Sequence, residues 1–289
     1  MHSFASGPKK NYYGKGDVLV YRLYRDESRP SGQSAVFGAN VTILIYGDAF
    51  WPTYTTGDNT NLIATDSMKN FVQRETMNFE GGDLESYCLF VAEKFLTKYE
   101  QTEGVRITAE EVPWNAVGAR GVSFAPGGPD RAFARLELTR AATIEVRSGI
   151  RGFQLLRLGG SAFRGFVRDE YTTLPDIADR PLHMWLDLDW NYAESGAAYS
   201  GGAITKAVRG IVTEVFDGFT SGSIQEIIYQ TGMKILADIP AIDAIDLEAN
   251  NRTWDTIAEK GGAVGVYTDA RPPYGCLGLT LCRESDPRK

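Results

Sequence analysis

The chain has few of the residues from which metal sites and disulfide frameworks are built. Its 289 residues include two histidines and three cysteines, and neither an HExxH motif nor a CxxC pair is present. An odd number of cysteines without such spacing indicates reduced thiols; they are Cys88, Cys276 and Cys282. The sequence therefore predicts no metal site built from several imidazoles or paired thiolates, and leaves open only a magnesium site made of carboxylates.

Long apolar runs and an excess of basic charge are also missing. No stretch approaches the ~20 apolar residues that cross a bilayer, and the N-terminal sequence MHSFASGPKKNYYGKG lacks the apolar core of a signal peptide. A net charge of −7 argues against a groove that neutralises nucleic-acid phosphates. With 43% hydrophobic and 23% charged residues, we expect a globular cytoplasmic protein that binds neither membrane nor nucleic acid.

The two halves of the chain align with each other at a constant offset of 140 residues. Leu96 then corresponds to Leu236 and Trp114 to Trp254. Other equivalent pairs are Met68 with Val208, Phe79 with Phe219, Leu84 with Ile224, Val105 with Ile245, and Ile107 with Leu247. The unbroken register and the matched tryptophans predict a duplication, with one domain over residues 1–145 and a second over 146–289.

Apolar spacing predicts the same order of elements in both halves. Alternation from Val41 to Ile45, and again from Met184 to Trp190, is typical of strands with one buried face. Spacing of three and four residues predicts helices; its members are Leu84, Cys88, Val91 and Phe95 in the first half and Ile224, Ile227, Ile228, Thr231 and Ile235 in the second. We expect an α+β protein in which each half has the order strand, strand, helix, helix, strand, strand and its antiparallel sheet carries helices on one face. Proline and glycine predict a long turn at residues 122–130.

The segment FRGFVRDEYTTLPDIADR, residues 163–180, contains groups suited to a flat anionic heterocycle. Such a ring requires a π-face for stacking and a planar fork of donors for two neighbouring acceptors. Phe163 and Arg180 would supply these groups. The alternative is a core phenylalanine and a surface arginine that pairs with Asp176 or Asp179.

Two segments of the first half carry polar residues at positions that local structure alone could also explain. In IATDSMKN, residues 63–70, Thr65 or Asp66 precedes a helical pattern and is a suitable N-cap. In YGKGDVLVYRL, Lys15 stands just before the first predicted strand, where a lysine is commonly only solvated.

Two segments of the second half are equally ambiguous. Gln225 in SGSIQEIIY offers a donor and an acceptor to an amide-like edge. Ser223 as an N-cap and Glu226 as its partner would also form a capping box there, and the two interpretations are compatible. The segment EANNRTW, residues 248–254, contains Asn250.

The chain resembles the urate oxidase (uricase) family. The matching segments follow that family's order and are spread over nearly the whole chain, from Tyr13 to Trp254. The resemblance implies that Phe163 stacks on the purine while Arg180 and Gln225 bind its opposite edges beside the apolar Ile224. It also implies that Thr65 and Asp66 reach the substrate from a neighbouring subunit, that Lys15 is the catalytic lysine, and that Asn250 lies beside the site of O2 or water.

The resemblance carries further expectations about fold and chemistry. It implies two tandem tunnelling-fold domains, a barrel-shaped homotetramer with active sites shared between subunits, and oxidation of urate by O2 without a cofactor. No GxGxxG or P-loop motif suggests a nucleotide cofactor. The C-terminal sequence ESDPRK does not resemble a peroxisomal SKL signal, which favours a bacterial cytoplasmic protein.

One residue departs from the family pattern. Two residues after the asparagine, where the family usually has a histidine that completes a proton relay, this chain has Arg252. Arginine stays charged, so we expect it to act through its fixed charge, by lowering the pKa of Lys15 or stabilising charge on urate. The alternative is an arginine that points away and pairs with Glu248 or Asp255. His183 belongs to no motif that would replace the missing histidine.

Two other functions stay open at this point. A pterin-processing enzyme of the same fold class would also bind flat rings, although its zinc-dependent members need histidine and cysteine ligands that are scarce here. A non-catalytic purine-binding protein would follow if the loss of the histidine had abolished turnover.

Overall fold

A computed structural model describes residues 11–24, 36–118, 122–262, 264–270 and 272–283. The N-terminal segment before Asn11 and the terminal sequence ESDPRK therefore lie outside the described residues. The chain divides into two compact units. Unit 1 consists of Met1–Gly128, Ala132–Ser148 and Ser195–Gly202; unit 2 consists of Pro129–Arg131, Gly149–Glu194 and Ala203–Lys289. The boundary at residue 145 stays a prediction.

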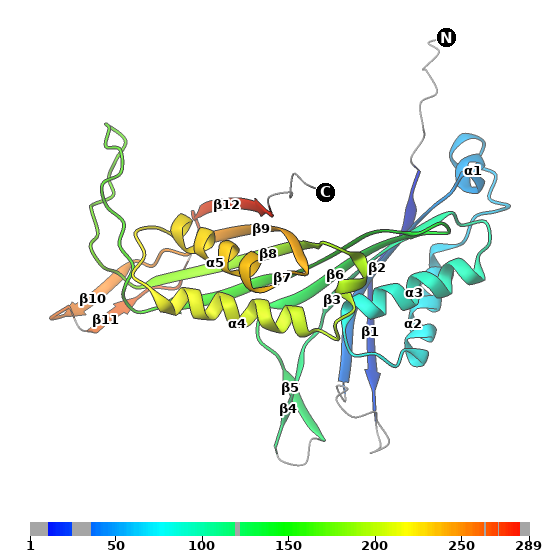
Figure 1. The fold of residues 1–289 in the computed structure, drawn as a ribbon, viewed down its shortest axis with the longest axis horizontal. Coiled ribbons are helices and arrows are strands. Elements are labelled where there is room, and N and C mark those ends of the chain that lie inside the picture. Colours follow the sequence, from blue (N-terminus) through cyan, green and yellow to red (C-terminus); the bar gives the residue numbers. More distant parts are fainter. Residues whose placement is uncertain (1–10, 25–35, 119–121, 263, 271, 284–289) are drawn as a thin grey trace, which may run out of the picture. The chain divides into compact units, whose positions relative to one another are not determined.

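Unit 1 is an antiparallel sheet with helices on one face (Figure 1). Its strands pair in the order β1-β2-β3-β6. Their bounds are β1 Tyr13–Leu23, β2 Val36–Tyr46, β3 Gly104–Glu111 and β6 Arg131–Thr139. The helices are α1 Trp51–Thr55, α2 Thr65–Glu75 and α3 Leu84–Lys98, and the 3-10 turns are η1 Asp48–Phe50 and η2 Thr76–Asn78. A separate hairpin consists of β4 Trp114–Val117 and β5 Ser123–Pro126.

Unit 2 repeats this plan. Strand β7, Thr143–Arg157, begins in unit 1 and continues into unit 2, where the strand order is β7-β8-β9-β12. The other strands are β8 Leu182–Tyr192, β9 Ile242–Asn251 and β12 Gly275–Cys282, and β10 Thr256–Lys260 pairs with β11 Val264–Tyr267 in a hairpin. Helices α4, Ala203–Gly218, and α5, Ile224–Asp238, cover one face of this sheet (Figure 1), and η3 spans Ser195–Ala198. The predicted order of elements is confirmed for the main sheets and the two long helices of each unit, and the structure adds α1 and the hairpins β4–β5 and β10–β11 to it.

Alternating burial explains why the sheets have one apolar face. In β2, Val41, Ile43 and Ile45 are fully buried, whereas the residues between them are only half-buried. In β8 the buried set is Leu182, Met184, Leu186, Leu188 and Trp190. These side chains meet the buried faces of the helices, where each large aliphatic residue contributes roughly 1.5–3 kcal/mol through burial.

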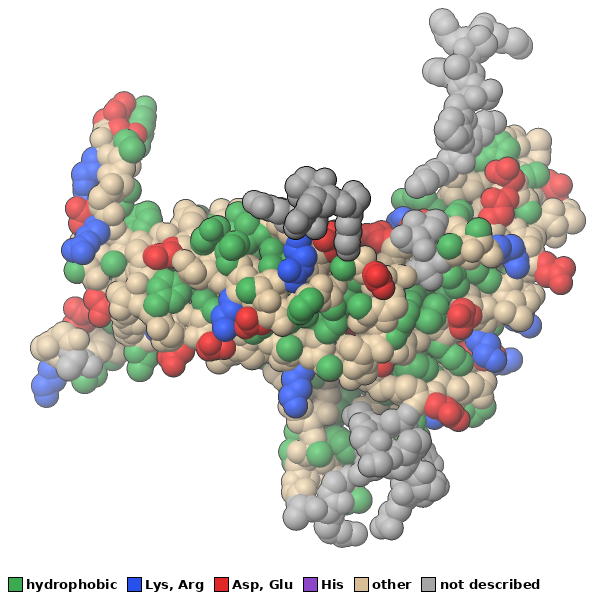
Figure 2. Space-filling view, viewed as in Figure 1, with side chains coloured by type: hydrophobic (Ala, Val, Ile, Leu, Met, Phe, Trp, Pro, Cys, Tyr) green, Lys and Arg blue, Asp and Glu red, His purple; other side chains and the backbone are tan. Residues whose placement is uncertain are grey.

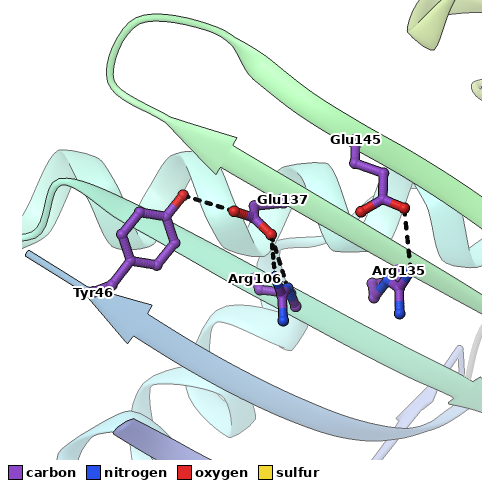
Figure 3. Close-up of polar contacts among 5 residues, drawn as sticks. All are labelled: Tyr46, Arg106, Arg135, Glu137 and Glu145. Atoms are coloured by element: carbon purple, nitrogen blue, oxygen red, sulfur yellow. Dashed lines mark hydrogen bonds and ion pairs between the residues drawn. The ribbon is translucent and has the colours of Figure 1, made fainter. Parts of the chain in front are cut away.

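Polar side chains occupy the other face of the unit 1 sheet. Arg106 alternates with the buried Val105 and Ile107 and pairs in register with Glu137. Its Nε donates to Oε2 of Glu137 at 2.9 Å, and the hydroxyl of Tyr46 donates to Oε1 at 3.1 Å (Figure 3). Burial, followed by the Glu137 carboxylate, raises the pKa of Tyr46 to about 12. Glu137 is 7% exposed, and its hydrogen-bond partners offset part of the cost of burying its carboxylate.

The duplication extends to the polar contacts that begin the equivalent helices. Asp83 is the N-cap of α3 and accepts from the amide of Ser86 at 2.8 Å. Ser223, at the 140-residue offset, is the N-cap of α5 and accepts from the amide of Glu226 at 3.1 Å. Each cap satisfies an amide that has no partner within its helix.

The helices also end in the same way. Arg140 donates to the carbonyls of Leu96, Tyr99 and Thr102 around the end of α3. Arg283 donates to the carbonyls of the equivalent residues around the end of α5, which are Leu236, Ile239 and Ile242. A cation that binds free helix carbonyls also interacts favourably with the helix dipole.

The structure corrects three details of the sequence analysis. Residues 122–130 are not one long turn, because Ser123–Pro126 pairs with β4 as strand β5 and its proline stands at the strand end. Lys15 lies within β1 and not before it. Neither Thr65 nor Asp66 caps α2, because the N-cap is Ala64, which has no side chain that could accept a hydrogen bond. Among the described residues, no helix is long and apolar enough to cross a membrane.

Candidate functional site

Several predicted site residues meet at one end of unit 2. Helix α5 packs against β9 and a short turn joins the two, so the beginning of α5 lies at the end of β9. Strand β9 pairs antiparallel with β8, and Met184 near the start of β8 faces Asn251 at the end of β9. The loop that joins β7 to β8, drawn in green in Figure 1, therefore enters β8 near the beginning of α5.

Backbone hydrogen bonds join this loop to the segment that leads into α5. The amide of Ala162 donates to the carbonyl of Ser221 at 2.8 Å, and the amide of Ser221 donates to the carbonyl of Gly160 at 3.0 Å. The amide of Arg180 donates to the carbonyl of Ser161 at 3.0 Å. Phe163 and Ile177 exchange hydrogen bonds across the loop. The ends of the 163–180 segment are thus held beside the first turn of α5.

Arg180 has no carboxylate within ion-pair distance among the described residues. Asp176 pairs with Arg168 at 3.4 Å, and Asp179 accepts from the amide of Ser161 at 3.1 Å. Burial lowers the pKa of the Arg180 guanidinium, and its Nε is buried without a hydrogen-bond partner. The surface ion pair that was the alternative for Arg180 is absent from the described part of the chain. A desolvated, unpaired guanidinium is suited to an anionic ligand.

Phe163 lies against this guanidinium. The guanidinium carbon of Arg180 is 5.9 Å from the centre of the Phe163 ring. Phe166 stacks on the same ring, with centroids 4.9 Å apart and planes inclined by 15°. The Phe163 ring is half-buried and is not a core residue.

Gln225 and Ile224 occupy the first turn of α5. Ile224 is 6% exposed and packs in the core, whereas the Gln225 side chain is exposed. The predicted capping box is present in a modified form, because Glu226 accepts from the amide of Gly222 at 2.7 Å and not from that of Ser223. The cap leaves the amide side chain of Gln225 available for a ligand.

Asn250 and Arg252 extend from the end of β9 on the face without helices. The guanidinium carbon of Arg252 is 4.0 Å from the ring centre of Trp185 and 4.0 Å from that of Tyr274. Trp185 faces Asn250 in register, and the Oδ1 of Asn250 is 3.8 Å from the thiol of Cys276.

The ion pair of Arg252 with Glu248 or Asp255 is absent within the described ranges, and the orientation of Arg252 toward the substrate stays a prediction. Its guanidinium lies against two aromatic rings, and contact with a π-face stabilises a cation. Sequence reasoning missed Trp185 and Tyr274. Trp185 lies on β8 and Tyr274 lies just before β12. Only the strand register brings these two residues next to Arg252.

His183 lies directly across from Arg252, and the amide of Arg252 donates to its carbonyl at 3.0 Å. The Nε2 of His183 accepts from the Trp185 indole at 3.3 Å, and its Nδ1 is buried without a partner. Burial, and then the charge of Arg252, lower the pKa of His183. The histidine is therefore neutral near pH 7 and supports the aromatic residues around Arg252.

Lys15, Thr65 and Asp66 belong to unit 1. The register between β1 and β2 shifts between Lys15 and Val18, which identifies a bulge, a feature common beside active sites. Asp66 is exposed, and its pKa is lowered by a hydrogen bond and charge from Lys69 and, to a smaller extent, by Lys15. Thr65 is the exposed first residue of α2, and its hydroxyl makes no hydrogen bond within the described part of the chain.

No group of three or more histidine, cysteine, aspartate or glutamate side chains that could hold a metal ion occurs among the described residues. The three cysteines are free thiols. The groups of this site that could bind a ligand are the Phe163 ring, the desolvated Arg180 guanidinium and the Gln225 amide. Together they suit one flat ligand.

Comparisons with known proteins agree on one family. The Uricase family model matches residues 11–141 and again residues 146–276, which confirms the duplication. The uric acid degradation bifunctional protein PucL of Bacillus subtilis is 36% identical over 94% of this chain, and the uricase of Haloferax volcanii is 32% identical over 94% of this chain and 97% of its own length. A hyperthermostable mutant of the Bacillus sp. TB-90 urate oxidase is similar in structure, with a TM-score of 0.86 and 34% identity over 94% of this chain and 98% of that chain. This chain spans 61% of the length of the Bacillus bifunctional proteins.

Proposed function

This chain belongs to the uricase family, and we propose that it oxidises urate with O2 and water to 5-hydroxyisourate and hydrogen peroxide. The observation that carries this proposal is the half-buried, unpaired guanidinium of Arg180 beside the Phe163 ring. Urate at neutral pH is a flat monoanion, and it matches both groups.

The substrate would lie on the Phe163 ring with its two edges bound by Arg180 and Gln225. Arg180 would donate two parallel hydrogen bonds to the anionic edge, because a guanidinium presents its donors in one plane. Gln225 would bind the opposite edge through its amide donor and acceptor, while Ile224 forms part of the apolar floor beneath it. Holding the ring flat in one orientation supplies the proximity that a reaction with dissolved O2 requires.

Proton transfer would fall to residues of a neighbouring copy. In this proposal the Thr65 hydroxyl and the Lys15 amine of a second subunit approach the purine and remove a proton through an ordered water, with Asp66 beside them. The Thr65 hydroxyl that caps no helix and the bulge at Lys15 both support this assignment. The protein would therefore act as a homotetramer with active sites at the subunit interfaces.

Arg252 and Asn250 would complete the site. Asn250 would hold O2, and later water, over the ring. Arg252 would stabilise the second negative charge that develops on urate, because a cation fixed against two rings needs no reorganisation during the reaction. A charge fixed in this way cannot pass protons, so the relay differs from the one that uses histidine.

The reaction balances without a further redox group. Urate loses two electrons and O2 gains them to form hydrogen peroxide with two protons. Water then adds to the oxidised ring to give the 5-hydroxy product. Urate is itself a strong reductant, so the residues assigned here bind, orient and move protons. The free thiols suit the reducing, cytoplasmic location that we expect for this enzyme.

The experiment that tests the proposal follows urate absorbance and peroxide release together after addition of metal-stripped protein. We expect loss of urate with formation of peroxide. Binding without turnover would support a non-catalytic purine-binding protein, and turnover of pterins alone would support the pterin-processing alternative.

A further inference from the structure

Arg157 is a nearly buried cation at the end of β7 that lies outside all the motifs of the sequence analysis. It is 9% exposed, and burial lowers the pKa of its guanidinium. Its Nη1 donates to the carbonyls of Phe216 and Phe219, each at 2.8 Å, around the end of α4. Its guanidinium also lies 5.2 Å from the centre of the Phe216 ring. A cation in this position satisfies carbonyls that α4 leaves free.

The other terminal nitrogen of Arg157 reaches toward the substrate residues. Nη2 donates to the hydroxyl of Ser221 at 2.6 Å, and Ser221 is fully buried. Ser221 in turn exchanges backbone hydrogen bonds with Gly160 and Ala162, next to Phe163. The Arg157 side chain thus holds Ser221, and Ser221 joins the loop that carries Phe163 to the segment that leads into α5.

The contacts of Ser221 extend in both directions along the chain. On one side, the carbonyl of Ser161 accepts from the amide of Arg180 at 3.0 Å, and Ser161 is 2% exposed. On the other side, Ser221 precedes the cap residue Ser223 and the first turn of α5, which presents Gln225. The distance between the Phe163–Arg180 side and the Gln225 side therefore depends on how firmly Ser221 is held.

We propose that Arg157 is a positioning residue of the urate site, which fixes the spacing between Gln225 and the Phe163–Arg180 pair through Ser221. This inference rests on the proposed function for the identity of the ligand. Within the described part of the chain, the hydrogen bonds of Arg157 go to Phe216, Phe219 and Ser221, so it would act through the backbone that it holds. A substrate bound at two opposite edges at once is sensitive to the spacing of the two binding groups, because a small displacement breaks one of the two contacts.

Arg283 supplies a matched control within the same unit. It is also an arginine that donates to three acceptors, and all three are carbonyls around the end of α5. That end lies at the opposite end of the helix from Gln225. A purely structural arginine should behave like Arg283 when it is replaced.

The experiment compares Arg157→Lys, Ser221→Ala and Arg283→Lys in the full chain. Lysine keeps the charge but cannot donate to three acceptors held in this geometry, and Ser221→Ala removes one acceptor while both backbone bonds remain. We expect the KM for urate to rise about tenfold in Arg157→Lys and about fivefold in Ser221→Ala, with kcat changed less than about twofold, because ground-state and transition-state binding weaken together. Arg283→Lys should lower Tm about as much as Arg157→Lys does, but it should leave the KM for urate unchanged.

Hydrogen exchange tests the positioning without any need for turnover. Arg157→Lys should speed amide exchange at residues 160–163 and 219–225, whereas Arg283→Lys should speed it only around residues 236–242. Unchanged exchange at the first two segments, or an unchanged KM in both Arg157→Lys and Ser221→Ala, would overturn the inference.

A wild-type protein that does not oxidise urate would instead overturn the proposed function, and amide exchange would still decide whether Arg157 orders the two segments. Ser221→Ala, the milder change, decides the question if Arg157→Lys does not fold.

Discussion

The guanidinium carbon of Arg252 lies 4.0 Å from the centre of the Trp185 ring. The centre of the Tyr274 ring lies at the same distance from that carbon. In the described part of the chain, the arginine that stands in place of the family's histidine therefore contacts two aromatic rings and no carboxylate. Because neither ring neutralises a full charge, the cation keeps its field toward the site.

Replacement of Arg252 by alanine should lower turnover of urate at least tenfold, about 1.4 kcal/mol of barrier. The loss follows from removal of a fixed charge that stabilises the second negative charge on urate. Steady-state kinetics across a pH series would measure it. Arg252→Lys, which keeps the charge, serves as the matched variant and should retain more activity than alanine. Turnover and a pH profile that are both unchanged in Arg252→Ala would contradict the charge role, and a gain in Arg252→His would reveal that a relay is usable but absent.

Replacement of Arg180 by lysine should weaken urate binding by roughly 1.5–3 kcal/mol, the scale of a hydrogen bond to a charged group. Lysine keeps the charge but loses the planar fork of donors. Equilibrium binding of urate without O2 would measure the effect. Arg168→Lys is the control, because Arg168 is an exposed arginine of the same segment that pairs with Asp176. Equal affinity in wild type and Arg180→Lys would return Arg180 to an ordinary surface role.

The sequence predicted the repeating elements well because their signals are local. Alternation in β2 and β8, and helical spacing in α3 and α5, each report one buried face, and the structure confirms these elements. The contacts of Arg140 and Arg283 that end the equivalent helices were not predicted, because each joins residues that are about forty positions apart. A pattern of apolar spacing carries no information on such polar contacts.

The candidate site was predicted less completely for a related reason. A motif identifies residue types, so Phe163 and Arg180 could be singled out, and the structure brings them together. The rings around Arg252 come from β8 and from the residue before β12, and only strand register makes them neighbours. Thr65 looked like a helix cap because threonine is a common N-cap residue, whereas in the structure Ala64 is the N-cap of α2.

Mixed subunits should recover activity if the site is shared between copies. Thr65→Ala removes the hydroxyl assigned to one subunit and Arg180→Ala removes the guanidinium assigned to another, so each variant alone should be inactive. After exchange of subunits, some sites would combine an intact Thr65 with an intact Arg180. Urate turnover before and after exchange measures the recovery. Absence of recovery, with exchange proved by differently tagged subunits, would refute a shared site.

The stability of the protein should fall as the pH drops below about 6.5, and His183 should account for part of that fall. Its folded-state pKa is lowered by burial and by Arg252, with Asp269 acting in the opposite direction. Above the unfolded value of 6.5 the histidine is neutral in both states. Below it, the unfolded chain binds the proton first, so the free energy of unfolding decreases until the pH passes the folded pKa.

Urea unfolding of wild type and His183→Gln at a series of pH values would measure this contribution. The variant should lose less stability than wild type as the pH falls below about 6.5, because only wild type has this histidine to protonate. Parallel curves for the two proteins would show that His183 titrates alike in the folded and unfolded states.

The proposed oxidation of urate by O2, without a metal or organic cofactor, is tested most directly by the stoichiometry of the reaction. Metal-stripped protein, checked for bound chromophores, would be mixed with urate while O2 uptake, urate absorbance and peroxide are recorded together. The account predicts one O2 consumed and one peroxide formed for each urate lost, at a rate that added metal does not raise. Urate that stays unoxidised by the stripped protein, or oxidation that returns only when a metal is added, would contradict it.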